Sequence, residues 1–408
     1  MKNLLLLGLA CTLLAFPMIL AADDAKVMPK NVGRLFVVPT FGSAETSYDA
    51  DGNADHFDPI KMFNLGFALE YGLGDWISAA AQWAPGATLS SDLNSKNPYY
   101  GLVGTEGRAH MNDLADLFLG AKIQLIGPKA PVTSSKFRVA FAPGLLVPLT
   151  QGPDFKSEVD GLMTDIMAGT TGILLNPTNV LSQEQAQAAA TKEALSGRKL
   201  ALNKMDNHAF ATGFRAYFDW LLSDNIFINF FNESLFYLQK KDLHRAGPNY
   251  AMWQEGYKEG VIKTLVGTGM GAQDALAAAN GIDFGAAEVD YKYKISFEIE
   301  PVIAAPLADN SIIFNFCLPV RYVYTPAYEY SFKNLGQGTP LDPGGAASLD
   351  YLDTNSHQTL YFTPAIQFLV LNSALPIEFK IQYGIPLALK NATAMNLLTV
   401  QMRLYFKT

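Results

Sequence analysis

Residues 398–406, near the end of the chain, read LTVQMRLYF, with an apolar side chain at every second position. Successive side chains of a β-strand point to opposite faces, so one face of this segment is wholly apolar and the other carries Thr399, Gln401 and Arg403. Residues 377–387 repeat the alternation with charged side chains on the polar face. Both segments are therefore predicted to be strands with two chemically different faces.

The same period of two recurs along the chain. It predicts twelve strands, with one hairpin more or fewer as the margin, at 32–41, 63–72, 75–84, 114–126, 136–149, 207–222, 224–238, 289–303, 311–325, 358–371, 375–389 and 395–407. Short turns alternate with longer connections, which lie at 42–62, 85–113, 150–206, 239–288 and 326–357. Outer-membrane barrels combine an even strand number with short periplasmic turns and long external loops. The spacing therefore predicts an antiparallel outer-membrane β-barrel with both chain ends periplasmic.

The composition favours this barrel over a soluble β-sandwich. Of the 408 residues 49% are hydrophobic and only 17% charged, where a soluble domain carries about 25% charged residues. After residue 22 there is no run of about 20 apolar residues that could span a bilayer as a helix. The apolar strand faces are rich in Phe and Leu, whereas a sandwich would place its charged face outward. The net charge of -8 also argues against a nucleic-acid partner.

Residues 1–22 have the pattern of a secretory signal peptide, with Lys2, an apolar stretch to Leu20 and the small residues Ala21 and Ala22. A signal anchor and a lipoprotein signal at Cys11 are the alternatives. Removal of the signal would leave residues 23–408 as one outer-membrane barrel domain with helical insertions at about 150–206 and 239–288. We therefore expect the protein in the bacterial outer membrane, in contact with membrane lipid.

Aromatic residues near the strand ends suggest the two girdles that barrels place at the membrane interfaces. At the periplasmic ends these are Tyr71, Trp76, Trp220 and Tyr405, and at the outer ends Trp83, Tyr237, Tyr291, Tyr322 and Tyr324. Strand propensity alone would also enrich aromatic residues at these positions.

The two insertions interrupt the alternation with apolar residues at helical spacing. The candidate apolar capture or plug residues are Val159, Leu162, Met163, Ile166 and Met167 in the first insertion and Trp253, Tyr257 and Leu265 in the second. Ser182 and Gln185 resemble a capping box before an alanine-rich helix. We expect these faces to pack on each other, to enter the barrel mouth, or both. They would form either a helical cap or a gate with an apolar binding site.

Charges on the inward strand faces are the candidate lining of a solute path. They are Arg215, Asp219, Glu233, Lys292, Lys294, Glu298, Arg321, Glu378, Lys380 and Arg403. Both signs occur, so many of these charges could simply pair across strands. No catalytic residue and no cofactor is predicted, because the five histidines are dispersed and no serine–histidine pair can be nominated. Asp49, Asp51, Asn53 and Asp55 alternate oxygen ligands without a complete calcium loop, so no metal site is assigned.

Two short patches resemble outer-membrane proteins of the FadL-type fatty-acid transporters and the meta-pathway family. Residues 69–76, LEYGLGDW, resemble a hairpin in which a strand ending in Glu-Tyr-Gly turns into an aromatic-led strand. Residues 379–388, with QYGIP at 382–386, are similar to late strands of those proteins. The resemblance implies passive uptake of small hydrophobic or amphipathic molecules.

These observations predict a monomeric channel, and not an enzyme, for passive uptake of small hydrophobic or amphipathic solutes such as fatty acids. Its partners would be membrane lipid, the solute and the barrel-assembly machinery that inserts such proteins. The alternative is an adhesin-like barrel with a structural or surface-interaction role, a sealed lumen and no transport.

Overall fold

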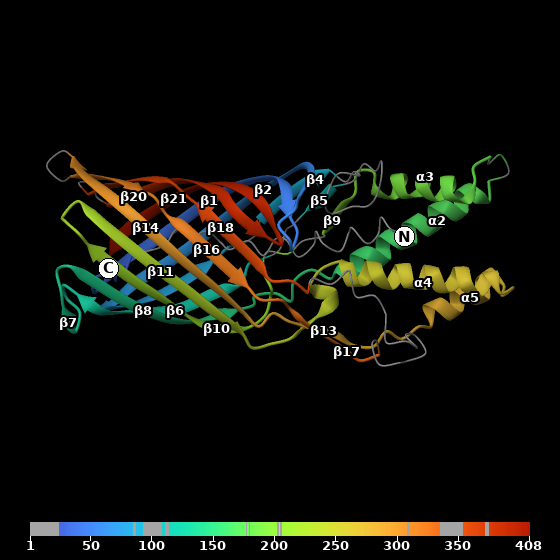
Figure 1. Cartoon of the computed structure of the whole chain (residues 1–408), viewed down its shortest axis with the longest axis horizontal. Helices are drawn as coiled ribbons and strands as arrows, with labels where there is room; N and C mark the ends of the chain where they lie inside the picture. The colour runs from blue at the N-terminus through green and yellow to red at the C-terminus, as the bar shows by residue number, and fades with distance from the viewer. Residues whose placement is uncertain are drawn as a thin grey trace.

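The computed structural model describes residues 24–84, 87–92, 108–110, 114–176, 178, 180–201, 204, 206–307, 311–334, 354–371 and 375–408. Within these residues the strands form a closed antiparallel barrel of twelve strand positions (Figure 1). Each position pairs with its neighbours in the sequence, and the last strand pairs with the first, with Arg34 opposite Tyr405. The predicted fold class and strand number are confirmed.

The strands of the barrel are longer than the predicted segments at several extracellular ends. In chain order they are β1 (Val32–Tyr48), β2 (Ala54–Gly74), β3 (Ile77–Trp83) with β4 (Ala87–Asp92), β6 (Leu117–Gly127), β8 (Phe137–Val147), β10 (Ala211–Leu221), β11 (Ile226–Tyr237), β14 (Tyr293–Leu307), β15 (Ile312–Cys317) with β16 (Val320–Thr325), β18 (His357–Phe362) with β19 (Ala365–Val370), β20 (Ile377–Lys390) and β21 (Ala392–Lys407). The first external connection, expected to be a loop over 42–62, is mostly strand. Its ladder continues to Tyr48 and Ala54, because pairing does not require an apolar face outside the membrane.

Two neighbouring strand positions are interrupted by proline. Pro319 separates β15 from β16, and Pro364 separates β18 from β19. Proline has no backbone N–H and cannot donate to the ladder. The wall nevertheless remains joined, since Leu318 N donates to Pro301 O at 3.0 Å and Thr363 N donates to Pro319 O at 2.9 Å.

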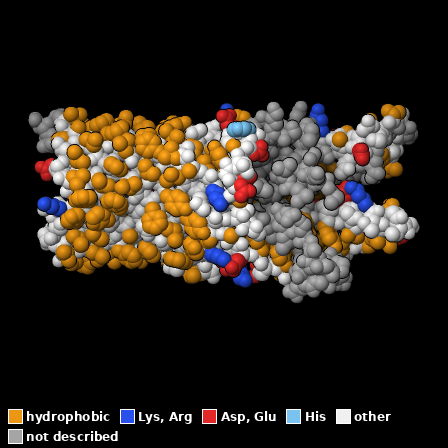
Figure 2. Space-filling view, in the orientation of Figure 1, with side chains coloured by type: hydrophobic (Ala, Val, Ile, Leu, Met, Phe, Trp, Pro, Cys, Tyr) orange, Lys and Arg blue, Asp and Glu red, His pale blue; other side chains and the backbone are white. Residues whose placement is uncertain are grey.

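Apolar side chains cover the outside of the barrel. Figure 2 shows them as a continuous band, with charged side chains at its two ends. Exposed members include Phe63, Leu69, Leu119, Leu145, Phe297, Ile381 and Leu398. Their strand neighbours on the other face, such as Glu70 and Gln382, are buried. The sequence alternation thus separates a lipid-facing surface from a lumen, as expected for a transmembrane barrel.

The predicted girdles are only partly correct. Trp76 and Trp220, at periplasmic turns, are exposed, as an interface residue should be. Tyr405 lies instead on the lumen face, because it pairs with Arg34 and its hydroxyl donates to Glu378. Tyr291 precedes β14 and is buried above the barrel, where burial raises its pKa well above the ordinary value.

Helices of the two insertions extend away from the open end of the barrel, along its long axis (Figure 1). The first contains α2 (Phe155–Leu174) and α3 (Gln183–Leu195), and the second contains η1 (Leu243–Arg245), α4 (Asn249–Gly267) and α5 (Ala272–Asn280). The capping box predicted at Ser182 and Gln185 is present. Among the described residues, no helix is both long and apolar enough to cross a membrane.

A small aromatic core joins the second insertion to the barrel mouth. Its sheet consists of β12 (Lys241–Asp242), β13 (Ala287–Asp290) and β17 (Glu329–Phe332). Buried aromatic residues of this core, which we call the mouth cluster, are Tyr250, Phe284, Tyr291 and Tyr328. The short strands β5 (Arg108–His110), β7 (Val132–Thr133) and β9 (Lys199–Ala201) complete the described elements.

Candidate functional site: the lumen

The periplasmic end of the lumen contains paired charges on β1 and β2. Arg34 Nη2 lies 2.6 Å from Glu70 Oε2, and the two side chains are only 3% and 5% exposed. The Ser78 hydroxyl donates to the second oxygen of Glu70 at 2.7 Å. Buried carboxylates need this kind of pairing, because an unpaired charge in a low-dielectric interior is costly.

The adjoining strands β21, which pairs with β1, and β20 are organised in the same way. Arg403 Nη1 lies 2.7 Å from Glu378 Oε1, and Tyr405 donates to Glu378 Oε2 at 2.6 Å. Lys380 of β20 pairs with Glu300 of β14, a strand that is not its neighbour, and both side chains are buried. Asn229 Nδ2 in turn donates to Glu300 Oε2 at 3.0 Å. Together these side chains form what we call the polar ring, which consists of Arg34, Glu70, Asn229, Glu300, Glu378, Lys380 and Arg403.

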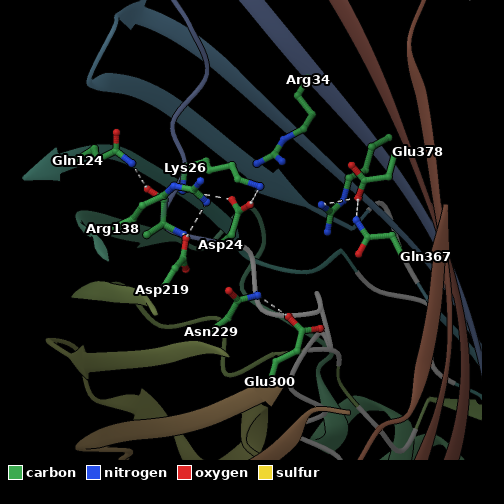
Figure 3. Close-up of polar contacts among 12 residues, drawn as sticks. Asp24, Lys26, Arg34, Gln124, Arg138, Asp219, Asn229, Glu300, Gln367 and Glu378 are labelled. Atoms are coloured by element: carbon green, nitrogen blue, oxygen red, sulfur yellow. Dashed lines mark hydrogen bonds and ion pairs between the residues drawn. The ribbon is translucent and has the colours of Figure 1, made fainter. Parts of the chain in front are cut away.

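The chain segment before β1, residues 24–29, lies inside the barrel at the level of this ring. Ala25 is fully buried, and its N–H donates to both carboxylate oxygens of Asp219, at 2.9 and 3.1 Å. Figure 3 shows Asp24, Lys26 and Asp219 together on one side of the lumen, with Glu378 and Gln367 on the other. The segment is therefore held against the side of the lumen that carries Asp219.

Further anchors come from two other strands, β6 and β3. Lys122 donates to the carbonyl of Asp24, Gln124 Nε2 donates to Ala25 O at 2.9 Å, and Met28 N donates to Ser78 Oγ at 3.3 Å. Sequence periodicity could not reveal this segment, since it is too short to show a period and its partners are distant in the chain. It was not among the predicted site residues.

A cavity of about 910 Å³ lies between residues 24–29 and the opposite wall. One side is lined by Lys26, Val27 and Met28, and the other includes Glu378 and Arg403. Residues of the periplasmic turns, among them Pro128, Asp224 and Pro376, also line it. This volume, within the range of small-molecule sites, therefore lies at the periplasmic end of the barrel.

Beyond the polar ring, the two sides of the lumen differ in chemistry. An apolar wall is formed by inward residues of β1, β2, β18 and β21, namely Phe36, Val38, Ile60, Met62, Ala68, Tyr361, Met395 and Leu397. The facing strands carry aromatic side chains next to charges. Arg215 pairs with Glu233 at 2.6 Å and lies 3.8 Å from the ring centre of Phe118, and Lys122 lies 4.2 Å from that of Tyr217. We call this side the charged aromatic wall.

Two cations of the charged aromatic wall have hydrogen-bonding capacity to spare. Arg321 is only 5% exposed, and its Nε and Nη1 have no acceptor, while Nη2 makes one long contact of 3.4 Å to Ser296. Lys294 interacts electrostatically with the carboxylates of Glu233 and Asp206 and with Arg321, but no described residue forms a hydrogen bond or ion pair with its ammonium group. Buried donors normally have acceptors, so these two residues form a candidate site for a polar group of a solute.

Most of the predicted lumen charges lie on inward faces of barrel strands. They are Arg215, Asp219, Glu233, Lys294, Glu298, Arg321, Glu378, Lys380 and Arg403. Lys292 is the exception. It lies between β13 and β14 with a φ of 58°, and its side chain pairs with Glu329 of β17 at the mouth. The strand period was extended one step too far there, because the ladder of β14 begins at Tyr293.

The predicted apolar capture residues lie on helices that project away from the lumen. Val159, Leu162 and Ile166 are buried on α2, Met163 is half-buried and Met167 is 48% exposed. Trp253 and Tyr257 pack against Phe284 of the mouth cluster, and Leu265 is half-buried on α4. The buried helix face is thus occupied by protein, and residues 24–29, not these helices, enter the barrel.

The acidic residues of the first external turn form a hydrogen-bonded turn. Asn53 Nδ2 donates to Asp49 Oδ2 at 2.9 Å, and Asp49 Oδ1 accepts from the backbone N–H groups of Asn53 and Asp51 at 2.8 and 2.9 Å. These bonds, above all that of the Asn53 side chain, lower the pKa of Asp49. Gly52 supplies the left-handed conformation, with a φ of 86°. No group of three metal-binding side chains occurs among the described residues.

No protein-family model and no curated protein sequence matches the chain. Similar solved structures include an outer membrane channel from Pseudomonas putida F1, with 11% identity, a TM-score of 0.48 and coverage of 95% of this chain and 100% of that chain. A FadL homologue of Pseudomonas aeruginosa has 10% identity and a TM-score of 0.33, with coverage of 93% and 90%. The toluene transporter of Pseudomonas putida has 8% identity and a TM-score of 0.35, with coverage of 96% and 94%.

The sequence resemblance thus pointed to a kind of barrel that occurs among the similar solved structures. Scores and identities this low do not transfer the solutes of those proteins to this chain. The location follows from the molecule itself, since a closed barrel with an apolar outer band and charged ends matches a bilayer. The chain is a bacterial outer-membrane β-barrel protein.

Proposed function

We propose that the protein is a passive outer-membrane channel for small hydrophobic or amphipathic solutes, such as fatty acids. The observation that carries the proposal is the contrast between the apolar wall and the charged aromatic wall on opposite sides of one lumen. A solute with an apolar body and a polar end is complementary to such a surface, because its apolar part leaves water while its polar group keeps hydrogen-bond partners.

Arg321 and Lys294 offer the polar end of the solute its donors. The guanidinium of Arg321 can donate an N–H group to a solute oxygen without breaking an existing bond. Phe36 and Val38 on β1 then offer apolar contact across the lumen. Both ends of an amphipathic molecule are therefore accommodated.

Residues 24–29 lie at the periplasmic exit of this path. Their anchors are individual hydrogen bonds, each worth about 1 kcal/mol, or somewhat more where a charged group takes part. The cavity of about 910 Å³ beside them gives room for the segment to move without displacing the wall. We propose that a solute passes when the segment moves aside.

Uptake by liposomes that contain the purified protein tests the proposal. We expect labelled fatty acid to enter faster than a sugar of similar size, and Phe36→Lys to reduce fatty-acid uptake by about tenfold. Lys258→Gln, which lies on α4 outside the lumen, is the matched control and should leave uptake unchanged. Zero conductance in a planar bilayer, together with fatty-acid uptake equal to that of empty liposomes, would contradict transport.

One observation favours the alternative, a surface-interaction barrel. The turn between α2 and α3 exposes Leu175 (76%) and Val180 (94%), far from the lumen. Exposed apolar residues at such a tip are typical of contact surfaces. Deletion of residues 151–200 separates the two functions, because it would abolish a surface interaction, whereas a channel through the lumen would still take up the solute.

A further inference from the structure

A buried group of titratable side chains lies where the first helical hairpin leaves and rejoins the barrel. Asp116, fully buried at the start of β6, donates its backbone N–H to Asp206 Oδ2 at 2.9 Å. Asp116 Oδ1 lies 3.4 Å from Nδ1 of His208, which is 1% exposed. Neither carboxylate oxygen of Asp116 accepts a hydrogen bond. Two carboxyl groups are thus held together with few donors, an arrangement that disfavours two negative charges.

The same group joins both ends of the first hairpin. Thr150 Oγ1, on the outgoing segment after β8, lies 3.3 Å from His208 Nδ1, on the returning segment before β10. Gly152 contacts the ring of His208 so closely that a Cβ there would lie 2.7 Å from Cδ2. Two residues further, Asp154 caps the first turn of α2. Movement of His208 would therefore be transmitted to the start of α2.

The second insertion is connected to this point as well. Arg245 of η1 donates to the carbonyl of Gly152 at 2.9 Å, and another of its nitrogens lies 4.0 Å from Asp154. Displacement of residues 150–154 would therefore disturb the contact between the two helical hairpins. His208 itself has a φ of 50°, an unusual conformation for a residue other than glycine, so the surrounding contacts hold it in place.

We propose that Asp116, Asp206 and His208 form a proton-operated latch at the base of the first helical hairpin, closed while Asp206 carries a proton and released when the proton is lost. Loss of the proton leaves two carboxylates side by side at a buried position. Repulsion then frees residues 206–210 and, through His208, residues 150–155. The hairpin of α2 and α3 gains mobility above the barrel mouth.

The neighbouring groups set the pH at which release occurs. Burial and then the carboxylate of Asp116 raise the pKa of Asp206 from 3.8 to about 7. The other charged or titratable groups around the latch come from six places in the fold. They are Lys204 before β10, Lys294 of β14, Tyr237 of β11, Lys241 of β12, Arg245 of η1, and Tyr291 and Tyr328 of the mouth cluster. A raised carboxyl pKa means that the folded latch holds its proton more tightly than the unfolded chain. Its stability therefore falls as pH rises from about 4 to about 7.

Hydrogen exchange of the full-length protein in lipid tests the latch. Protection factors for residues 150–155 and 206–210, corrected for intrinsic exchange at each pH, should fall at least about tenfold between pH 6 and pH 8.5. Asp206→Asn keeps an acceptor for the Asp116 N–H but cannot ionise, so protection should stay high across this range. Glu184→Gln, an exposed carboxylate on α3, should behave like the wild type.

A second variant keeps the test informative if Asp206→Asn does not fold. Asp116→Asn removes the repelling carboxylate. The fall in protection with rising pH should therefore become smaller, and the pH of its midpoint should change. A wild type with constant protection from pH 5.5 to 8.5 would overturn the latch. The latch would also be overturned if protection in Asp206→Asn fell with pH as much as it does in the wild type.

Discussion

The polar ring and the charged aromatic wall both place charges inside the barrel, but they differ in how their cations are paired. Every cation of the ring has a carboxylate partner, whereas the wall combines the paired Arg215 with Arg321, which has no such partner among the described residues. In the ring, Arg34, Lys380 and Arg403 each have a carboxylate within ion-pair distance. On the charged aromatic wall, Arg321 has two nitrogens without an acceptor. Paired charges of this kind stabilise the wall, whereas a buried donor without a partner is available to a ligand. The comparison therefore separates structural charges from functional ones.

The largest effect is expected from breaking a pair in the polar ring. Arg34→Ala leaves Glu70 buried without its cation, and the loss of one partner of a buried pair costs about 3–5 kcal/mol. Reversible urea unfolding in lipid would measure this loss of unfolding free energy. The double variant Arg34→Met/Glu70→Gln should recover a large part of it. An Arg34→Ala barrel as stable as the wild type would show that the ring pairs are not structural.

A smaller effect, on binding and not on stability, is expected at Arg321. Arg321→Gln should weaken binding of a carboxylate amphiphile about tenfold, which corresponds to about 1.4 kcal/mol, and leave binding of the matching neutral alcohol unchanged. Competition with a fluorescent fatty acid would measure both. Arg403→Gln is the informative comparison, since the loss of a paired cation should reduce stability more than binding. Equal losses for the acid and the alcohol would contradict a role for Arg321 in binding the polar end.

The smallest effect is expected where residues 24–29 meet the wall. Asp219→Ala removes both acceptors of the Ala25 N–H. The other anchors remain, so single-channel conductance should rise only about two- to threefold, as expected for the loss of about one hydrogen bond. Ser223→Ala, in the turn after β10, is a control from the same end of the barrel. Conductance lower than that of the wild type would contradict the proposed place of the segment in the path.

Sequence periodicity predicted the barrel because the alternation of apolar and polar residues within each strand is enough to identify its lipid-facing and lumen-facing sides. The alternation in residues 377–387 and 398–406 can be recognised without knowing which strands pair with them. Strands β20 and β21 contain these two segments, as predicted. The functional site depends on contacts across the lumen, and these have no local signature. The attachment of Ala25 to Asp219 spans 194 positions. The pairing of Lys292 with Glu329 was missed because the period cannot show where a ladder begins.

The helical insertions also show that periodicity cannot identify which parts of the protein a residue contacts. The helix face of Val159, Leu162 and Ile166 was correctly identified as apolar, and the residues are buried. Periodicity could not show whether this apolar helix face packs against another helix, a solute or the barrel. The signal peptide predicted for residues 1–22 lies outside the described residues and stays a prediction.

A reversible cross-link tests the solute path most directly. In a Cys317→Ala background, Met28→Cys and Ser78→Cys place two thiols where the backbone of residue 28 already contacts the side chain of residue 78. Fatty-acid uptake by liposomes should fall at least about tenfold when the pair is oxidised and recover when it is reduced, while each single variant should not respond to oxidant. Undiminished uptake through the oxidised protein would show that the solute does not leave past residues 24–29.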